Sequence, residues 1–582
     1  MTENAKQVIR DMVENANKEA RRANHDLEKR RALEDFSLPH ECPVTPLGKC
    51  GDVYYYLDMD RQLRALPASK HVKNEISSLF DRDQALLYDY WPRMDEKGKV
   101  SGWRPELAAH GLMQAAADKG IIDFESRMRG PGCWRSVDGK LVMHCGDRVY
   151  IGGESFQPGV LDGCIYHAAP PTPHPLDGDD SGVGEEVLSL LKTWNWHRPD
   201  IDPTLLLGWI VAAVAGGALK WRPLVWLTGS RGTGKSTLQS VIDGLVGESG
   251  LVKASDATAA GIWQTVKDSS LPIALDEMEA DEDNRRAMNV IKLARQAASG
   301  GVVLRGGSDH TQMSFTARSC FIFSSVLIPP LTSADISRMA ILNLNPLEGQ
   351  PAPVINNRRL AELGRRLRHR LMMQWHRFNA TLEAYSAQLM SVGHSGRGAD
   401  QFGTLLACAD LLFADSVPDG DTLETWGKAL ARDTLAEAED DVDDHERCIQ
   451  HVLTSPIDVY RGGQKRQVGD WIAVAAGYVH GDDDPLEANK VLASYGLKVI
   501  WEDRTPWLAI ANSHQGLASI FRETHWAAKS GSLSGWVQAV RRIPGAQRGT
   551  GLRFAGVPAK DTRVPITSIL GEPEAVHKRL LP

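Results

Sequence analysis

The sequence has little of several features that would narrow its class. It contains only 8 cysteines in 582 residues. Because none of them forms a C-x-x-C pair, we expect a reducing compartment, the cytoplasm, and no disulfide scaffold. The formal net charge of −8 does not indicate nucleic-acid binding by the chain as a whole, so any such contact must come from local basic patches. The N-terminus also lacks the apolar core of a signal peptide.

Long apolar runs are missing as well. The most apolar stretch, residues 205–219, is shorter than the roughly 18 residues that are needed to span a bilayer. We therefore predict a buried helix there and no contact with a membrane. A chain of 582 residues that is 42% hydrophobic and 24% charged is typical of a soluble protein with three or more domains.

The clearest motif lies near the middle of the chain. An apolar run at residues 224–227 leads into Gly229-Ser-Arg-Gly-Thr-Gly-Lys-Ser236, which fills every position of G-x-x-x-x-G-K-[ST]. Apolar residues then recur at helical spacing, and strand, glycine-rich loop and helix together are the context of a phosphate-binding loop. The alternative is a glycine-rich turn that binds nothing. The predicted nucleotide-binding residues are Gly229, Ser230, Arg231, Gly232, Thr233, Gly234, Lys235, Ser236 and Thr237.

A second motif completes this predicted site for ATP and Mg²⁺. Residues 271–275 form an apolar strand pattern that ends in Asp276 and Glu277. In a site of this kind Lys235 reaches the β- and γ-phosphates, and the Ser236 hydroxyl binds Mg²⁺. We expect Asp276 to hold the metal through water and Glu277 to polarise the water that attacks the γ-phosphate.

Two further strand patterns follow. Residues 315–325 end in two hydroxyls, and residues 339–344 come directly after Arg338. With the hairpin pattern at 137–143, the helix at 208–212, the glycine-rich loop and the acidic pair, these stretches resemble the helicase module of phage and plasmid primase–helicase proteins, the superfamily 3 and poxvirus-type AAA+ group. The resemblance covers a little over a third of the chain.

The resemblance implies roles for two more residues. The polar residue at the tip of the fourth strand would be Ser325, or Ser324, where such helicases usually have asparagine. Arg338 falls where the family has an arginine finger, which reaches the γ-phosphate bound by a neighbouring subunit. The alternative for Arg338 is a salt bridge with Asp335 in the same chain. The predicted catalytic residues are therefore Glu277, Lys235, Arg338 and Ser325.

Contacts with DNA are predicted in three places. In superfamily 3 helicases a hairpin before the sensor strand grips one DNA strand, and here it would be residues 302–315, with Arg305 and His310 near the tip. The alternative is a surface turn. The helix at 357–377 has a face rich in arginine, which would contact DNA or an acidic neighbour, or be solvated. The C-terminal candidates are Arg541, Arg542, Arg548 and Arg553, whose alternative role is structural.

The predicted fold is α/β and has five parts. Residues 1–35 form a charged helical arm, and 36–184 a small α/β domain with no catalytic constellation, which could bind a replication protein. Residues 185–348 form the AAA+ P-loop core, and 349–445 a helical lid. Residues 446–582 have the short helices and strands of a winged-helix-like domain; we expect its Trp536 to fill a core.

Two functions from different classes remain open. The first is a ring-forming ATPase, a hexamer by analogy, that translocates on single-stranded or forked DNA during replication of a phage or mobile element. The second is an AAA+ protein remodeller, loader or defence ATPase that acts on a protein partner. A P-loop kinase is disfavoured, because nothing in the sequence resembles an acceptor site and the strands continue to Arg338.

Overall fold

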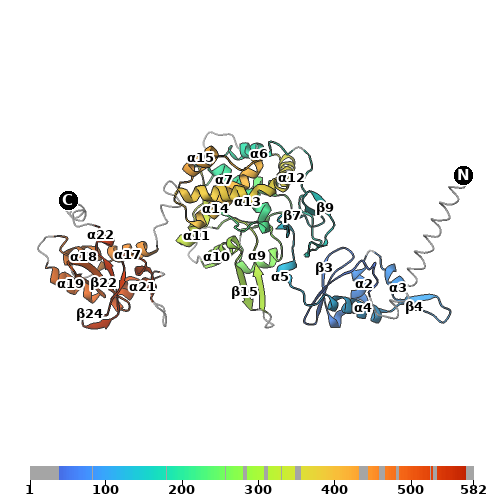
Figure 1. The fold of residues 1–582 in the computed structure, drawn as a ribbon, viewed down its shortest axis with the longest axis horizontal. Helices are drawn as coiled ribbons and strands as arrows, with labels where there is room; N and C mark the ends of the chain where they lie inside the picture. The colour runs from blue at the N-terminus through green and yellow to red at the C-terminus, as the bar shows by residue number, and fades with distance from the viewer. Residues whose placement is uncertain are drawn as a thin grey trace. The chain divides into compact units, whose positions relative to one another are not determined.

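The computed structural model describes residues 38–571 except 82, 179, 256, 279–284, 307–311, 330, 348–354, 432–443, 458–465, 480–483, 523, 525 and 528–533. The charged arm predicted for residues 1–35 lies outside this part of the chain. The chain divides into two compact units, Met1–Glu437 and Ala438–Pro582 (Figure 1). Within the described residues, no helix has both the length and the apolar character that crossing a membrane requires.

A five-stranded parallel sheet forms the centre of the first unit. Its order is β13-β14-β17-β12-β18. The strands are β12 (Leu224–Gly229), β13 (Val252–Ala254), β14 (Ile273–Leu275), β17 (Phe321–Ser325) and β18 (Met339–Leu344). The apolar sequence runs of β12 and β17 are those of strands buried on both faces. The protein is thus a mixed α/β protein with a parallel sheet of the kind that carries a phosphate-binding loop.

Helices cover the two faces of this sheet. On one face, α9 (Ala259–Val266) and α10 (Arg285–Ser299) pack against Trp226, Phe321 and Phe323. Trp226 and Phe323 stack there with ring centroids 4.8 Å apart. The side chains that alternate with these point to the other face, where α8 (Lys235–Val246) lies.

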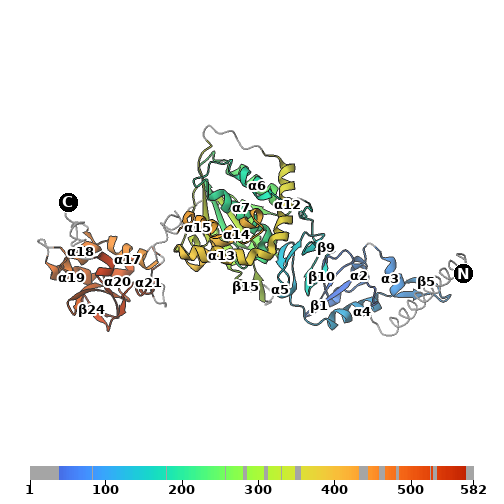
Figure 2. The same cartoon turned by 45° about the horizontal axis from the view of Figure 1, so that its top comes forward.

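The part of the chain before residue 170 consists of small antiparallel sheets and helices (Figure 2). Strands β2 and β3 pair antiparallel as a hairpin. The elements of this N-terminal part are β1 (Thr45–Cys50), β2 (Val53–Leu57), β3 (Leu63–Pro67), α2 (Lys73–Leu79), α3 (Ala85–Tyr90), β4 (Pro92–Met94), β5 (Val100–Trp103), α4 (Pro105–Asp118), α5 (Phe124–Arg127), β6 (Gly132–Arg135), β7 (Leu141–His144), β8 (Val149–Ile151), β9 (Glu154–Phe156), β10 (Gly159–Leu161) and β11 (Cys164–Tyr166).

This N-terminal part joins the central sheet next to Ser270, which precedes β14. Ser270 donates its backbone N–H to Pro131 at 3.0 Å and its hydroxyl to the carbonyl of Cys133 at 3.1 Å. A Cβ on Gly132 would lie 2.2 Å from the Ser270 hydroxyl, so the two backbones need glycine to approach this closely. His167 Nε2 lies 2.7 Å from the Asp268 carboxylate, and this ion pair adds a charged contact to the junction.

Helices that precede and follow the sheet in sequence pack beside it. Contacts join α13 to α14, α14 to α7 and α12 to α8. The helices are α6 (Val183–Leu191), α7 (Asp202–Ala215), α12 (Asn357–Gln374), α13 (Phe378–Ser391), α14 (Gly396–Phe413) and α15 (Gly420–Ala429). Every residue of α7 is buried, which confirms the buried helix predicted at residues 205–219.

Several arginines of α12 have acidic or carbonyl partners within the chain, which the sequence did not predict. Arg359 and Arg366 both pair with Glu186 of α6. Arg370 pairs with Asp415 at 2.6 Å. Arg368 is buried and donates to the carbonyls of Leu245 and Val246 at the C-terminal end of α8. Arg359, Arg366, Arg368 and Arg370 thus have partners inside the chain, whereas Arg358 and Arg365 are exposed, and contact of this face with DNA or an acidic neighbour stays a prediction.

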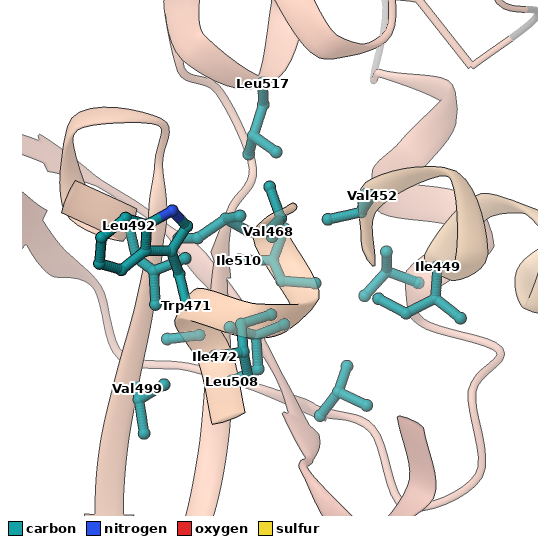
Figure 3. Close-up of a cluster of buried hydrophobic side chains, with 14 of the residues drawn as sticks. Ile449, Val452, Val468, Trp471, Ile472, Leu492, Val499, Leu508, Ile510 and Leu517 are labelled. Carbon is teal, nitrogen blue, oxygen red and sulfur yellow. The ribbon is translucent and has the colours of Figure 1, made fainter. Parts of the chain in front are cut away.

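The second unit has its own core. Helices come first, then a four-stranded sheet of order β21-β22-β26-β23. In Figure 3, Trp471 and Leu492 lie on one side of the core and Ile449 and Val452 on the other, with Ile510 between them. The elements are α17 (Asp444–Thr454), β19 (Pro456–Ile457), β20 (Arg466–Gln467), α18 (Val468–Ala475), α19 (Pro485–Ser494), β21 (Leu497–Glu502), β22 (Thr505–Ala511), α20 (Gln515–Ile520), α21 (Gly535–Val540), β23 (Gln547–Arg548), β24 (Leu552–Phe554), β25 (Val557–Ala559), β26 (Asp561–Pro565) and α22 (Thr567–Leu570).

Candidate nucleotide site

The glycine-rich loop links β12 to α8, as the sequence predicts. Gly232 and Gly234 both have φ of 81°, a left-handed conformation that glycine adopts without strain. A Cβ on Gly229 would lie 2.5 Å from the carbonyl oxygen of Leu344, so this glycine allows the loop to pass close to β18. Thr233 is buried, and its hydroxyl donates to the carbonyl of Ser230 at 3.1 Å, which braces the turn.

Helix α8 begins at Lys235, directly after this loop. No side chain caps its N-terminus, and its first turn contains no acidic residue. The N–H groups of the first turn and the positive end of the helix dipole therefore face the loop, where an anion such as a phosphate is stabilised. The ammonium group of Lys235 donates to the carbonyl of Gly229 and, at 3.2 Å, to that of Ser230, so it lies over the loop that it is predicted to serve.

The acidic pair follows β14 at the same edge of the sheet. Asp276 donates its N–H to Ala254 at 3.0 Å and accepts the N–H of Glu277 on Oδ1 at 2.9 Å. Glu277 has φ of 55°, a left-handed conformation that costs a non-glycine residue about 1 kcal/mol. The strain holds the carboxylate in a sharp turn that a regular strand would not provide. A strained residue at a predicted site supports a functional role.

The residues fit the predicted metal. Asp276 and Gln239 of α8 line one cavity of about 360 Å³, so Asp276 lies on the α8 side of the sheet, and Ser236 is in the first turn of that helix. A carboxylate and a hydroxyl are oxygen ligands of the kind that Mg²⁺ takes, with phosphates and waters completing its shell.

The two hydroxyls at the end of β17 point to opposite faces of the sheet. Ser325 accepts a hydrogen bond from Trp226 Nε1 at 2.9 Å, on the face that α9 and α10 cover. Ser324 is 2% exposed and lines the cavity that also contains Asp276. The geometry therefore favours Ser324 over Ser325 for the polar position at the strand tip.

Arg338 lies far from the glycine-rich loop of its own chain. It directly precedes β18, whose Met339 pairs with Leu224 and whose Leu344 pairs with Gly229 in a parallel register. At about 3.3 Å per residue, the strand separates the two edges of the sheet by roughly 17 Å. The loop and the acidic pair share the carboxyl edge of the sheet, and Arg338 lies at the amino edge, too far away to reach a phosphate on its own loop.

The surroundings of Arg338 are cationic. Burial lowers the pKa of Arg338, and the nearby Arg397 and Arg295 lower it further, more than Asp335 raises it. The carboxylate of Asp335 binds Arg295 at 2.9 Å and the Thr332 hydroxyl at 2.5 Å. Asp335 thus contacts Arg295 and Thr332 and also acts on Arg338, and the charges of Arg338, Arg295 and Arg397 lie close enough to affect one another.

The hairpin before β17 is present in the backbone. β15 (Val302–Gly306) and β16 (Gln312–Thr316) pair antiparallel and extend away from the sheet (Figures 1 and 2). Arg305 lies on β15 and pairs in register with Met313. His310 lies outside the described residues. Because β16 leads into the amino end of β17, the base of this hairpin is at the same edge of the sheet as Arg338.

The C-terminal arginines are spread over three elements. Arg541 is half-buried at the end of α21, whereas Arg542, Arg548 and Arg553 are exposed after α21, on β23 and on β24. Trp536 is 1% exposed and stacks on Phe521 with ring centroids 5.3 Å apart. The prediction that Trp536 fills a core is confirmed.

One residue at the site was missed by sequence reasoning. Trp194 is 2% exposed, and its indole N–H donates to the carbonyl of Gly234 at 3.1 Å. It lies between α6 and α7, and no motif or spacing marks it. A tryptophan that precedes a phosphate-binding loop by some forty positions gives no local signal of contact, so only the fold reveals it.

Comparisons with known proteins add a distant similarity. No model of a known family matches the chain, and no curated protein matches it. Among solved structures, the A-form apo structure of the NrS-1 C-terminal region is similar with a TM-score of 0.34 and 11% identity, over 90% of this chain and 97% of that one. The apo structure of NrS-1 C-terminal region 305–718 has a TM-score of 0.34 and 12% identity, over 89% of this chain and 95% of that one. At these TM-scores the similarity does not support a particular function, so the functional argument rests on the residues of the candidate site.

Proposed function

We propose that this chain is an ATP-hydrolysing, ring-forming AAA+ translocase that moves on DNA. The observation that carries the proposal is the division of the predicted site between the two edges of one sheet. The phosphate-binding loop and Asp276–Glu277 lie at the carboxyl edge, and Arg338 lies at the amino edge. A site divided in this way is complete only when the amino edge of a second copy meets the carboxyl edge of the first.

The residues at the carboxyl edge have distinct tasks in this proposal. The N–H groups that begin α8, with Lys235, bind and orient the phosphates. Ser236 and Asp276 would hold Mg²⁺, which neutralises the charge that develops on the transferring phosphoryl group. Glu277 orients a water and accepts its proton, and Ser324 offers a hydroxyl beside Asp276. Arg338 of a second copy stabilises negative charge in the transition state.

The choice of DNA as the substrate rests on the hairpin. β15 and β16 extend from the amino edge, where Arg338 also lies, so a ring closed through that edge brings hairpins from successive copies together. A basic residue such as Arg305 on each copy would then contact backbone phosphates without reading the sequence. The exposed Arg542, Arg548 and Arg553 of the second unit, which has winged-helix-like elements, are further candidates for phosphate contact.

The test is the rate of ATP hydrolysis by the full chain with and without single-stranded DNA, at two salt concentrations. We expect DNA to stimulate hydrolysis and the stimulation to weaken at the higher salt concentration, because phosphate contacts release counterions. Hydrolysis that DNA does not stimulate, together with DNA binding that salt does not weaken, would contradict the translocase and favour a remodeller that acts on protein. Lys235→Ala is the control and should not hydrolyse ATP.

A further inference from the structure

Residues 194–197 form a short extended segment between α6 and α7 that is fastened to the end of β18. Trp196 forms an antiparallel bridge with Leu344. Asn345 donates its N–H to the carbonyl of Asn195 at 2.8 Å, and His197 donates its N–H to the carbonyl of Asn343 at 2.9 Å. These backbone bonds fix the segment at the side of the sheet where the glycine-rich loop begins.

Trp194 extends from this segment onto the glycine-rich loop. Its Nε1 donates to the carbonyl oxygen of Gly234 at 3.1 Å. The same oxygen accepts the N–H of Leu238, the first hydrogen bond of α8, at 2.9 Å. Both lone pairs of this carbonyl are therefore used. A Cβ on Gly234 would lie 2.9 Å from the indole nitrogen, so a side chain here would displace the ring.

The carbonyl of Gly234 and the N–H of Lys235 belong to one planar peptide. In a trans peptide these two groups point in opposite directions. The carbonyl points along α8 and toward Trp194, so the N–H of Lys235 points out of the N-terminal end of the helix. That is the direction from which a helix N-terminus binds a phosphate. Gly234 has φ of 81°, and glycine is the most freely rotating residue, so this peptide needs support from outside the loop.

We propose that Trp194 is a positioning residue for the phosphate-binding loop. Its indole N–H fixes the Gly234–Lys235 peptide so that the N–H of Lys235 faces a phosphate of the bound nucleotide. Trp194 does not touch the nucleotide in this role; it acts through the peptide. The inference rests on the proposed nucleotide-binding function and adds to it one side chain, that of Trp194, which lies outside the loop motif.

Trp196 provides a matched control. It is 3% exposed, next to 2% for Trp194, and its Nε1 also donates to a carbonyl, that of Leu191 at 2.7 Å, outside the loop. Trp194→Phe and Trp196→Phe each keep a ring of similar bulk and remove one indole N–H. A purely structural role for both tryptophans predicts the same effect from both variants.

The experiment measures KM and kcat for MgATP and the Kd for ADP in both full-length variants, with thermal midpoints to show that each folds. Because the N–H of Lys235 contacts the phosphate in the ground state and the transition state alike, we expect Trp194→Phe to raise KM and the ADP Kd by roughly 3- to 10-fold and to change kcat by less than about 2-fold. Trp196→Phe should leave all three values unchanged. Equal effects from the two variants, or a fall in kcat at unchanged KM in Trp194→Phe, would overturn the inference.

Two additions keep the test decisive. If Trp194→Phe fails to fold, Trp194→Leu, which also lacks a donor, is measured in the same way, and a folded variant with wild-type KM and ADP Kd overturns the inference. Lys235→Ala separates this inference from the proposed function: if that variant binds ADP as the wild type does, the proposed function itself is wrong. If Lys235→Ala loses ADP binding and Trp194→Phe behaves like Trp196→Phe, the positioning role alone is wrong.

Discussion

The two edges of the central sheet carry different parts of the proposed chemistry. The carboxyl edge holds the groups proposed to bind a phosphate and a metal, and its loop is held in place by Thr233, Trp194 and the first turn of α8. The amino edge holds Arg338, the base of the β15–β16 hairpin and the junction with the N-terminal part. In the proposed function, one copy would bind the nucleotide, whereas hydrolysis and coupling to DNA would need the opposite edge of another copy.

The proposed division of roles between the two edges of the sheet would be wrong if Arg338 acted within its own chain. Arg338→Ala and Lys235→Ala should each lower kcat by roughly 10³-fold or more, because one removes transition-state charge stabilisation and the other the phosphate contact. A mixture of the two variants should regain hydrolysis, since an intact loop from one copy meets an intact Arg338 from the other. The measurement is the ATPase rate of the mixture against its mixing ratio. A mixture as inactive as its components would place Arg338 in the site of its own chain.

A change at the carboxyl edge should separate binding from hydrolysis. Glu277→Gln keeps the size of the side chain and removes the general base, so kcat should fall by roughly 10²- to 10⁴-fold while ADP binding stays at the wild-type value. Asp276→Asn should instead weaken the dependence of binding on Mg²⁺. Wild-type kcat in Glu277→Gln would assign the base to another residue.

The junction at the amino edge should make the fold sensitive to acid. Burial lowers the pKa of His144 to about 4, and the neighbouring His167 adds to this, whereas His167 itself has a raised pKa because it pairs with Asp268. The depressed pKa means that His144 loses its stabilising contribution as pH falls from about 6.5 to 4, worth roughly 3 kcal/mol. The raised pKa means that the pairing of His167 contributes below pH 6.5 and is lost as pH rises through its folded value.

Thermal midpoints between pH 7.5 and 4 test this sign. His144→Gln should flatten the decrease in midpoint on acidification, and His167→Gln should steepen it, since it removes the contribution that opposes the loss at His144. The reverse order of the two variants would contradict the assignment.

The hairpin at the amino edge should account for a modest part of DNA binding. Arg305→Ala should reduce the slope of log affinity for single-stranded DNA against log salt concentration by roughly 1 if each bound copy makes one such phosphate contact. Fluorescence anisotropy with a labelled oligothymidine measures the slope. An unchanged slope would remove Arg305 from the DNA contact and leave the C-terminal arginines to account for it.

The substitution with the smallest expected effect on stability and DNA binding lies on α12. Arg359 pairs with Glu186 on the surface, at 40% and 39% side-chain exposure, so Arg359→Ala should change stability by less than about 1 kcal/mol. The DNA affinity of the Arg359→Ala variant should equal that of the wild type, because this arginine already pairs with Glu186 in its own chain. Weaker DNA binding in Arg359→Ala would support α12 as a nucleic-acid surface.

The parts that sequence reasoning found are those that local patterns encode. The strand, loop and helix around Lys235 and the strand before Asp276 follow from short-range periodicity and glycine placement, and the parallel sheet confirms both strands. The sequence prediction named Ser325, with Ser324 as the alternative, and the geometry favours Ser324. Alternate residues of a strand face opposite sides, and only the register against β14 and β12 decides which side holds the carboxylate.

The parts that were missed depend on contacts between distant residues. The arginines of α12 were expected to contact DNA, an acidic neighbour or solvent, and the partners that Arg359 and Arg370 have within the chain, Glu186 and Asp180, lie nearly 200 residues earlier. Trp194 lacks any pattern that would connect it with Gly234. Charge and aromatic content thus indicate which residues need a partner, and the fold decides whether that partner lies in the same chain.

Arg368 sets a limit on how small a working fragment of this chain can be. It is buried, burial lowers its pKa, and it donates to the last carbonyls of α8, while the first N–H groups of the same helix face the glycine-rich loop. A Cβ on Gly364 would lie 2.0 Å from the carbonyl oxygen of Leu245, so α12 and α8 touch along their backbones. A fragment truncated at residue 348 would expose the end of the helix that carries Lys235. The shortest fragment that folds on its own and keeps the proposed nucleotide site must therefore continue through α12.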